Sequence, residues 1–132
     1  MDYLSGKQNT GAYLKDEKSD RLVSSKSNFT NFCDYVFSHL NPDEKAEIVE
    51  KFLTPDAITV LKDNELVDSV NAFFKNNLNI SETSRNAFLH RNTLLYRIEK
   101  IHKITGLNVR NFEDALYFKL LTIIYFDLTE RK

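Results

Sequence analysis

Apolar side chains along this chain recur at the spacing of amphipathic helices, and the alternation that marks β-strands is nearly absent. The first sustained pattern begins at Phe29, where apolar residues fall three and four positions apart as far as Leu40. Further stripes follow over 46–53, 58–61 and 66–74. The hydrophobic pattern therefore predicts an all-α, multi-helix domain.

Helix start signals divide the pattern into separate elements. The sequence NPDE at 41–44 combines an N-cap asparagine, a proline in the first turn and a capping-box glutamate. Thr54 with Pro55, and then Asn64, are the predicted starts of the next two helices. In the helix after Asn41, the side chains expected to face inward are Ala46, Ile48, Val49, Phe52 and Leu53.

Residues 81–105 predict two helices joined by a short turn, which is the helix-turn-helix arrangement. Ser81 is the expected N-cap of the first helix, which ends at Ala87 or Phe88. The second helix covers 91–105 and stops at Gly106, because glycine favours helix C-termini. On the second helix the residues predicted to share a buried face are Leu94, Ile98, Ile101 and Thr105.

The opposite side of the second helix carries hydrogen-bonding and cationic groups. These side chains belong to Asn92, Thr93, Tyr96, Lys100 and Lys103. Base edges in the major groove and the flanking phosphates accept this chemistry, and Arg91 stands at the helix N-terminus, where base contacts are usual. Arg97 falls between the two faces, so it either reaches a phosphate or pairs with an acidic group of the scaffold.

The charge distribution supports an anionic partner for this segment. The chain as a whole has a net charge of -1, with 18 basic and 19 acidic side chains. Residues 75–110 hold seven Lys or Arg and two Glu, which is a local charge of +5, whereas residues 1–74 hold eight basic and 13 acidic side chains. A basic island within an acidic chain favours contact with nucleic acid over a merely solvated charged face.

The sequence HRNTLLYRIEKIHKITG at 90–106, followed by FEDAL at 112–116, resembles the C-terminal DNA-binding domain of the PucR and sugar-diacid-regulator type of bacterial transcription factors. The resemblance covers about 64–128. It implies a helix-turn-helix related to that of Fis-type proteins, acting on promoter DNA, usually as a homodimer. It also implies that Ser81 and Thr83 approach phosphates. The residues that it assigns to the recognition helix or its entry are His90, Arg91, Asn92, Thr93, Tyr96 and Arg97.

Leu95 departs from the family pattern, because such sequences often carry arginine at this position. Family members also usually possess a large N-terminal sensory domain, and none fits within 132 residues. The chain is therefore either a piece of a longer regulator or a short regulator by itself. We expect a lead-in over 1–27, a helical support or dimerisation segment over 28–63, and the DNA-binding domain with a C-terminal apolar helix over 64–132.

The C-terminal helix, which Asn111 is expected to cap, has apolar residues on all its sides. One side carries Phe112, Leu116, Leu120 and Ile123, and the other carries Tyr117, Phe118, Leu121, Tyr125 and Leu128. Such a helix must be buried all round or covered by a partner. Either the N-terminal helices cover its second side within one chain, or a second copy does, and we favour the homodimer.

Several classes of function are disfavoured by the sequence. The three histidines and the single Cys33 have no metal-ligand spacing, and no phosphate loop, nucleophile elbow or carboxylate pair is evident, so we expect neither a metal or cofactor nor an enzyme. Cys33 is expected in the core. A lone cysteine fits a reducing cytoplasm. No apolar stretch approaches the about 20 residues that cross a bilayer.

Two functions from different classes remain. The first is a sequence-specific DNA-binding module of a bacterial transcriptional regulator, with the helix over about 91–105 in the major groove of double-stranded DNA. The alternative is a protein–protein interaction or dimerisation domain that keeps the helix-turn-helix fold without binding DNA.

Overall fold

The structure, a computed structural model, describes residues 27–130, and the side chain of Glu130 is not described. Within this range the backbone forms seven helices and no strand, which confirms the all-α prediction. Most of the predicted lead-in, 1–26, lies outside the described residues. The chain divides into two compact units, Met1–Leu40 and Asn41–Lys132.

The division after Leu40 falls within 28–63, the range that the sequence suggests as a helical support or dimerisation segment, and the role of that range stays a prediction. Helices on the C-terminal side of Leu40 pack against the last two helices of the chain. The physical reason is that the apolar face of a helix packs against helices far away in the sequence, and the residues next to it in the sequence do not indicate which helices these are.

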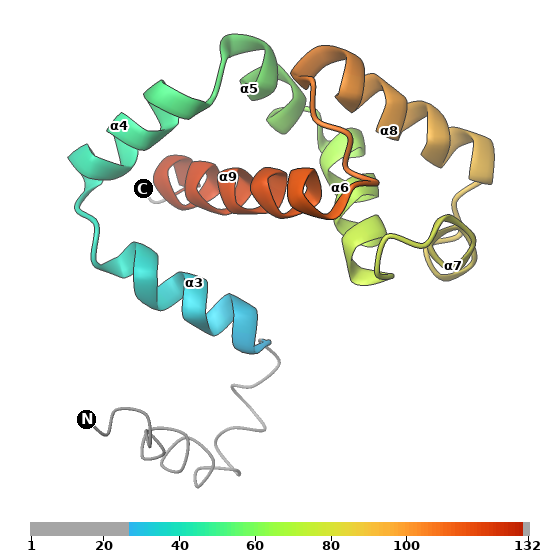
Figure 1. Ribbon diagram of the computed structural model, residues 1–132, viewed down its shortest axis with the longest axis horizontal. Helices are drawn as coiled ribbons and strands as arrows, with labels where there is room; N and C mark the ends of the chain where they lie inside the picture. Colours follow the sequence, from blue (N-terminus) through green and yellow to red (C-terminus); the bar gives the residue numbers. More distant parts are fainter. Residues whose placement is uncertain (1–26, 131–132) are drawn as a thin grey trace, which may run out of the picture. The chain divides into compact units, whose positions relative to one another are not determined.

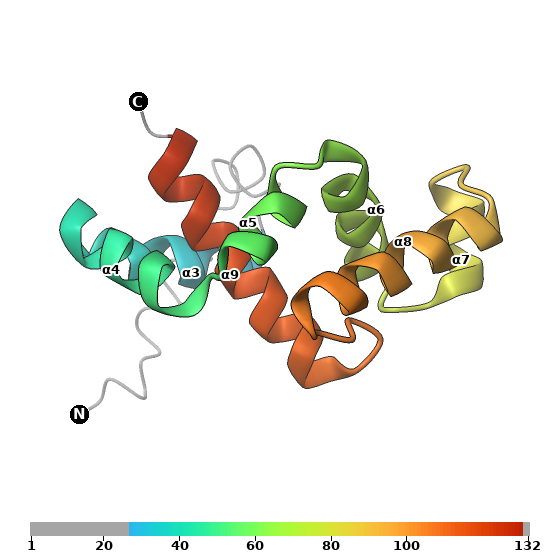
Figure 2. The same cartoon turned by 90° about the horizontal axis from the view of Figure 1, so that it is seen from above.

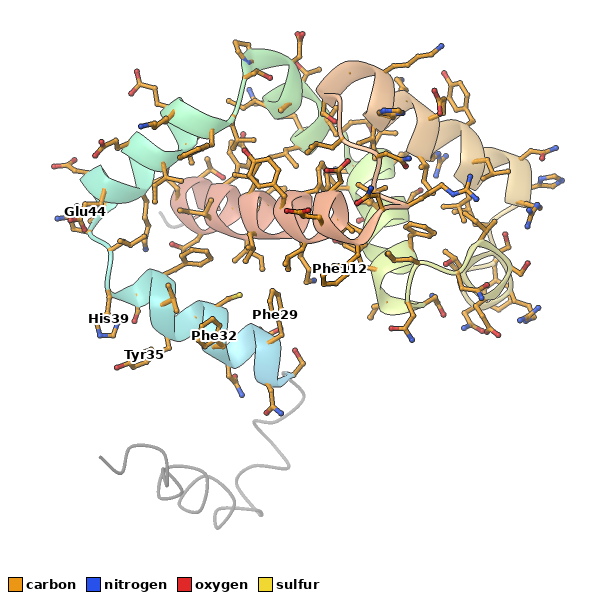
Figure 3. All side chains as sticks on the ribbon, in the orientation of Figure 1. Phe29, Phe32, Tyr35, His39, Glu44 and Phe112 are labelled. Atoms are coloured by element: carbon orange, nitrogen blue, oxygen red, sulfur yellow. The ribbon has the colours of Figure 1, made fainter. Side chains whose placement is uncertain are left out.

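The first unit contains one described helix, α3 (Asn28–Ser38). The side chain of Ser27 caps its N-terminus by accepting a hydrogen bond from Thr30 N at 3.1 Å. At the other end His39 is the C-cap, and its ring lies 4.5 Å from that of Tyr35 (Figure 3). Phe32 belongs to the predicted apolar stripe, yet 65% of its surface is exposed.

The second unit holds the other six helices (Figure 1). They are α4 (Pro42–Phe52), α5 (Pro55–Leu61), α6 (Asn64–Lys75), α7 (Ile80–Asn86), α8 (Arg91–Thr105) and α9 (Phe112–Glu130). The predicted caps at Asn41, Thr54 and Asn111 are confirmed. Asp63, rather than Asn64, caps α6, because its carboxylate accepts from both Glu65 N and Leu66 N.

Helix α4 begins with the predicted capping box. Asn41 Oδ1 accepts from Glu44 N at 2.8 Å, and Glu44 Oε1 accepts from Asn41 N at 2.9 Å. The face that α4 buries is shifted from the prediction, because Ala46 and Phe52 are exposed whereas Lys45 is buried. The Lys45 ammonium is paired with Asp127 Oδ2 of α9 at 2.6 Å, so a charged group occupies part of the α4–α9 contact.

The core of the second unit joins its helices around α8 and α9. Helices α5, α6 and α7 each pack against α8, and α4 packs against α9 (Figures 1 and 2). The largest fully buried side chains include Leu61 of α5, Phe73 of α6, Leu94 and Ile101 of α8, and Val109 of the connection to α9. The buried residues of α8 therefore belong to one continuous apolar core.

Candidate nucleic-acid interface

Helix α7 begins two residues earlier than the sequence suggests, and its N-cap is Asn79 rather than Ser81. Asn79 Oδ1 accepts from Glu82 N at 2.8 Å, and Thr83 Oγ1 donates to Asn79 O at 2.7 Å. The earlier start is favoured because it buries Ile80, which a cap at Ser81 would leave outside the helix.

The turn between α7 and α8 is held by hydrogen bonds at both ends. Ala87 N donates to Thr83 O at 2.8 Å, and Leu89 N donates to Ser84 O at 3.1 Å. His90 is the N-cap of α8, and its Nδ1 accepts from Asn92 N at 3.0 Å. Figure 2 shows α7 and the start of α8 together at one end of the second unit. This geometry fixes where the N-terminus of α8 points.

The buried side of α8 agrees with the prediction. Leu94, Ile98 and Ile101 are buried and belong to the core, and Thr105 is half-buried. The helix ends where the sequence predicts, at Gly106, whose φ of 82° is the left-handed conformation that glycine adopts without penalty. Burial along the whole length of α8 makes it a rigid platform for the side chains on its other face.

The exposed side of α8 carries most of the predicted contact residues. Arg91, Asn92, Tyr96 and Lys103 are exposed, while Thr93 and Lys100 are half-buried. Tyr96 has 65% of its surface exposed although it is aromatic. Glu99 is an exposed acidic side chain on the same side. Together these residues present cations, an amide and two hydroxyl-bearing groups on one helical surface.

The start of α7 lies beside the start of α8. Arg91 Nη1 is 3.5 Å from Ser81 Oγ, and both residues are exposed, so the structure brings these two predicted site residues together. Thr83, by contrast, is 0% exposed, and its hydroxyl is used within α7. Thr83 is therefore removed from the expected contact set, because a fully buried hydroxyl cannot reach a phosphate.

The side chain of Arg97 on α8 contacts two residues of α6. Its Nη1 donates to Ser69 Oγ at 2.9 Å, and its Nη2 lies 3.5 Å from Glu65 Oε1. Ser69 is only 4% exposed, so the guanidinium satisfies a buried hydroxyl. Of the two roles that the sequence leaves open for Arg97, the structure favours the scaffold contact.

Replacing Arg97 by alanine is expected to lower the free energy of unfolding by about 1–2 kcal/mol, because the Ser69 hydroxyl loses its buried partner. Arg85→Ala is the matched control. Arg85 also pairs with a glutamate, Glu82 at 2.9 Å, but both side chains are largely exposed, and such pairs contribute about 0–1 kcal/mol. Urea unfolding of both variants measures the difference, and equal losses would contradict the scaffold role of Arg97.

Comparison with known proteins places this arrangement in a family. The family model of the PucR C-terminal helix-turn-helix domain matches residues 66–124, which run from α6 into α9. Residues 66–124 belong to the PucR C-terminal helix-turn-helix family. The sequence resemblance, which rests on the residues of α8 and the start of α9, is confirmed.

Several curated proteins share part of the sequence. The chain is 47% identical over 45 residues to the carbohydrate diacid regulator of Escherichia coli, covering 34% of this chain and 12% of that protein. It is 29% identical over 59 residues to the purine catabolism regulatory protein of Bacillus subtilis, covering 45% and 11%. An uncharacterised Bacillus subtilis protein, YxkF, is 30% identical over 82 residues, covering 61% and 28%.

The chain thus spans less than a third of the length of these relatives. Two of these relatives are regulators by their names. No solved structure matches the chain significantly.

The packing of Leu95 accounts for an apolar residue at this position. This side chain is half-buried and packs against the core, so an apolar residue here contributes to the fold.

In the described part of the chain no cluster of His, Cys, Asp and Glu could hold a metal ion. None of the described helices is long and apolar enough to cross a bilayer.

Proposed function

We propose that the PucR-type domain binds double-stranded DNA sequence-specifically and regulates transcription, with α8 lying in the major groove. The observation that carries the proposal is the exposed face of α8, where Arg91, Asn92 and Tyr96 project from a helix whose other face is buried in the core at Leu94, Ile98 and Ile101. A rigid helix with cationic and amide groups near its N-terminus suits insertion into a groove about 12 Å wide.

The side chains are assigned different tasks within this proposal. Arg91, Asn92, Thr93 and Tyr96 read base edges, because they occupy the first turns of α8. Lys100 and Lys103 neutralise phosphates further along the helix, and Ser81 contacts a phosphate from α7. His90 caps α8 and thereby fixes its entry, and Arg97 holds α8 against α6.

We further propose that the chain acts as a homodimer through α9. On one side of α9, Phe118, Leu121 and Tyr125 are buried, although Tyr117 on that side is exposed and Leu128 is half-buried. Its other side is more open, because Phe112 at its start is 73% exposed and Leu116, Leu120 and Ile123 are only half-buried (Figure 3). A second copy covering this side would place two α8 helices on one DNA duplex, where half-sites repeat about every 34 Å.

A groove of about 510 Å³ beside α9 extends this open side. Residues of α6 and α9 line it, including Asn71, Ile123 and Phe126.

Chromosomal DNA as the partner implies a cytoplasmic location, in agreement with the single cysteine of the sequence.

The first test is fluorescence anisotropy of a labelled duplex titrated with this chain over a series of salt concentrations, with light scattering on the same samples. We expect the logarithm of affinity to fall steeply and linearly with the logarithm of salt concentration, because each neutralised phosphate releases counterions. We also expect the mass of a dimer. Absence of binding at low salt would instead favour a protein-interaction domain. If a monomer binds DNA, the homodimer proposal is wrong and the DNA-binding proposal stands.

A further inference from the structure

Phe88, in the turn between α7 and α8, is an apolar side chain in an unusual place. It is 95% exposed, the highest value among the exposed large hydrophobic residues of the described chain. It lies two residues before His90, the N-cap of α8. A single exposed apolar residue is common on protein surfaces, so exposure alone assigns no role.

The backbone of Phe88 supplies a second and independent observation. Its φ is 51°, in the left-handed region that a bulky side chain rarely occupies. Two other residues in the described range share a positive φ without being glycine. Asn77 is a residue type that tolerates this conformation, and Leu78 packs against the core, whereas Phe88 has neither reason.

The strained conformation of Phe88 is imposed by its neighbours. On one side Ala87 N donates to Thr83 O, and on the other Leu89 N donates to Ser84 O. Glycine would satisfy the same turn without strain. A phenylalanine held here, in water and in a disfavoured conformation, indicates a task that needs its apolar side chain.

The surroundings of the ring indicate the partner. Arg85, which is paired with Glu82, lies at the end of α7, and exposed Arg91 is the first residue of α8. Cationic neighbours on both sides favour an anionic partner over an apolar protein surface. We propose that Phe88 is an apolar contact of the helix-turn-helix with DNA, lying against a thymine methyl group or a deoxyribose ring next to the bases that α8 contacts. This inference rests on the proposed function and deepens it.

The decisive variant is Phe88→Gly, because glycine fits the positive φ and removes the whole apolar side chain. We expect an unchanged or higher melting temperature together with about tenfold weaker binding to a duplex selected from random sequences by the wild-type chain. The salt dependence of binding should keep its slope, because no phosphate contact is removed. Phe88→Leu should retain most of the affinity.

Two controls separate the ring of Phe88 from general effects. Phe52→Ala removes another exposed aromatic ring, 49% exposed on α4, and should leave DNA affinity unchanged. Replacing individual thymines of the selected duplex by uracil removes only methyl groups. If a uracil substitution weakens DNA binding by the wild type but not by Phe88→Gly, the ring contacts that methyl group. If the wild type binds the thymine and uracil duplexes with equal affinity, the ring contacts a deoxyribose instead.

Wild-type affinity in Phe88→Gly would overturn the proposal. Unchanged DNA affinity combined with lost transcriptional activity would also overturn it, because the ring would then contact a protein. These results differ from a failure of the proposed function, in which the wild-type chain itself binds no duplex.

Discussion

Leu94→Ala is expected to lower the free energy of unfolding by about 3–5 kcal/mol. Leu94 is 0% exposed and belongs to the core that supports the helix. Truncation removes buried apolar surface and leaves a cavity that the surrounding helices only partly fill. Chemical unfolding followed by circular dichroism measures the loss.

Leu95→Ala is the matched control for this prediction. The two leucines are adjacent on the same helix, but Leu95 is only half-buried. We expect the loss at Leu95 to be less than half of that at Leu94, since the energetic cost follows the buried area. Equal losses at the two positions would contradict the orientation of α8.

Arg91→Ala is expected to weaken binding to the preferred DNA site by about 1–3 kcal/mol and to relax the base preference at one position. Arg91 is exposed at the first residue of α8, and its guanidinium lies 3.5 Å from Ser81 Oγ, so no buried partner depends on it. Protein stability should therefore remain close to that of wild type. Anisotropy with the preferred duplex and its single-base variants provides the measurement.

Lys100→Ala provides the comparison for Arg91→Ala, because a lysine at this distance from the N-terminus is assigned to a phosphate. It should weaken binding to all duplexes alike and reduce the slope of the salt dependence by about one. Unaltered DNA affinity in both variants would contradict α8 as the recognition helix.

Much of the second unit could be predicted because its signals are local. The caps at Asn41 and Thr54, the stop at Gly106 and the buried face of α8 follow from residue types and the helical period alone. The family assignment also depends on local sequence, over residues 66–124. Such features need no knowledge of the rest of the chain.

Other features could not be predicted, because they depend on residues far apart in the sequence. Lys45 looks like a surface residue of an amphipathic helix, yet its ammonium is buried against Asp127, 82 positions later. Ser81 and Asn79 are both good caps, and the burial of Ile80 decides between them. The strained φ of Phe88 likewise has no signature in residue type.

The sequence by itself determined the all-α class, the helix-turn-helix and the set of polar groups on α8, because helical periodicity and capping act over a few residues. Only the tertiary structure decided which of these groups face solvent. Thr83 of α7 is buried and therefore cannot contact DNA, and Arg97 donates a hydrogen bond to Ser69. Arg91, Asn92 and Tyr96 are exposed. The physical reason is that burial and long-range hydrogen bonds depend on how helices pack, and packing joins residues that no local pattern connects.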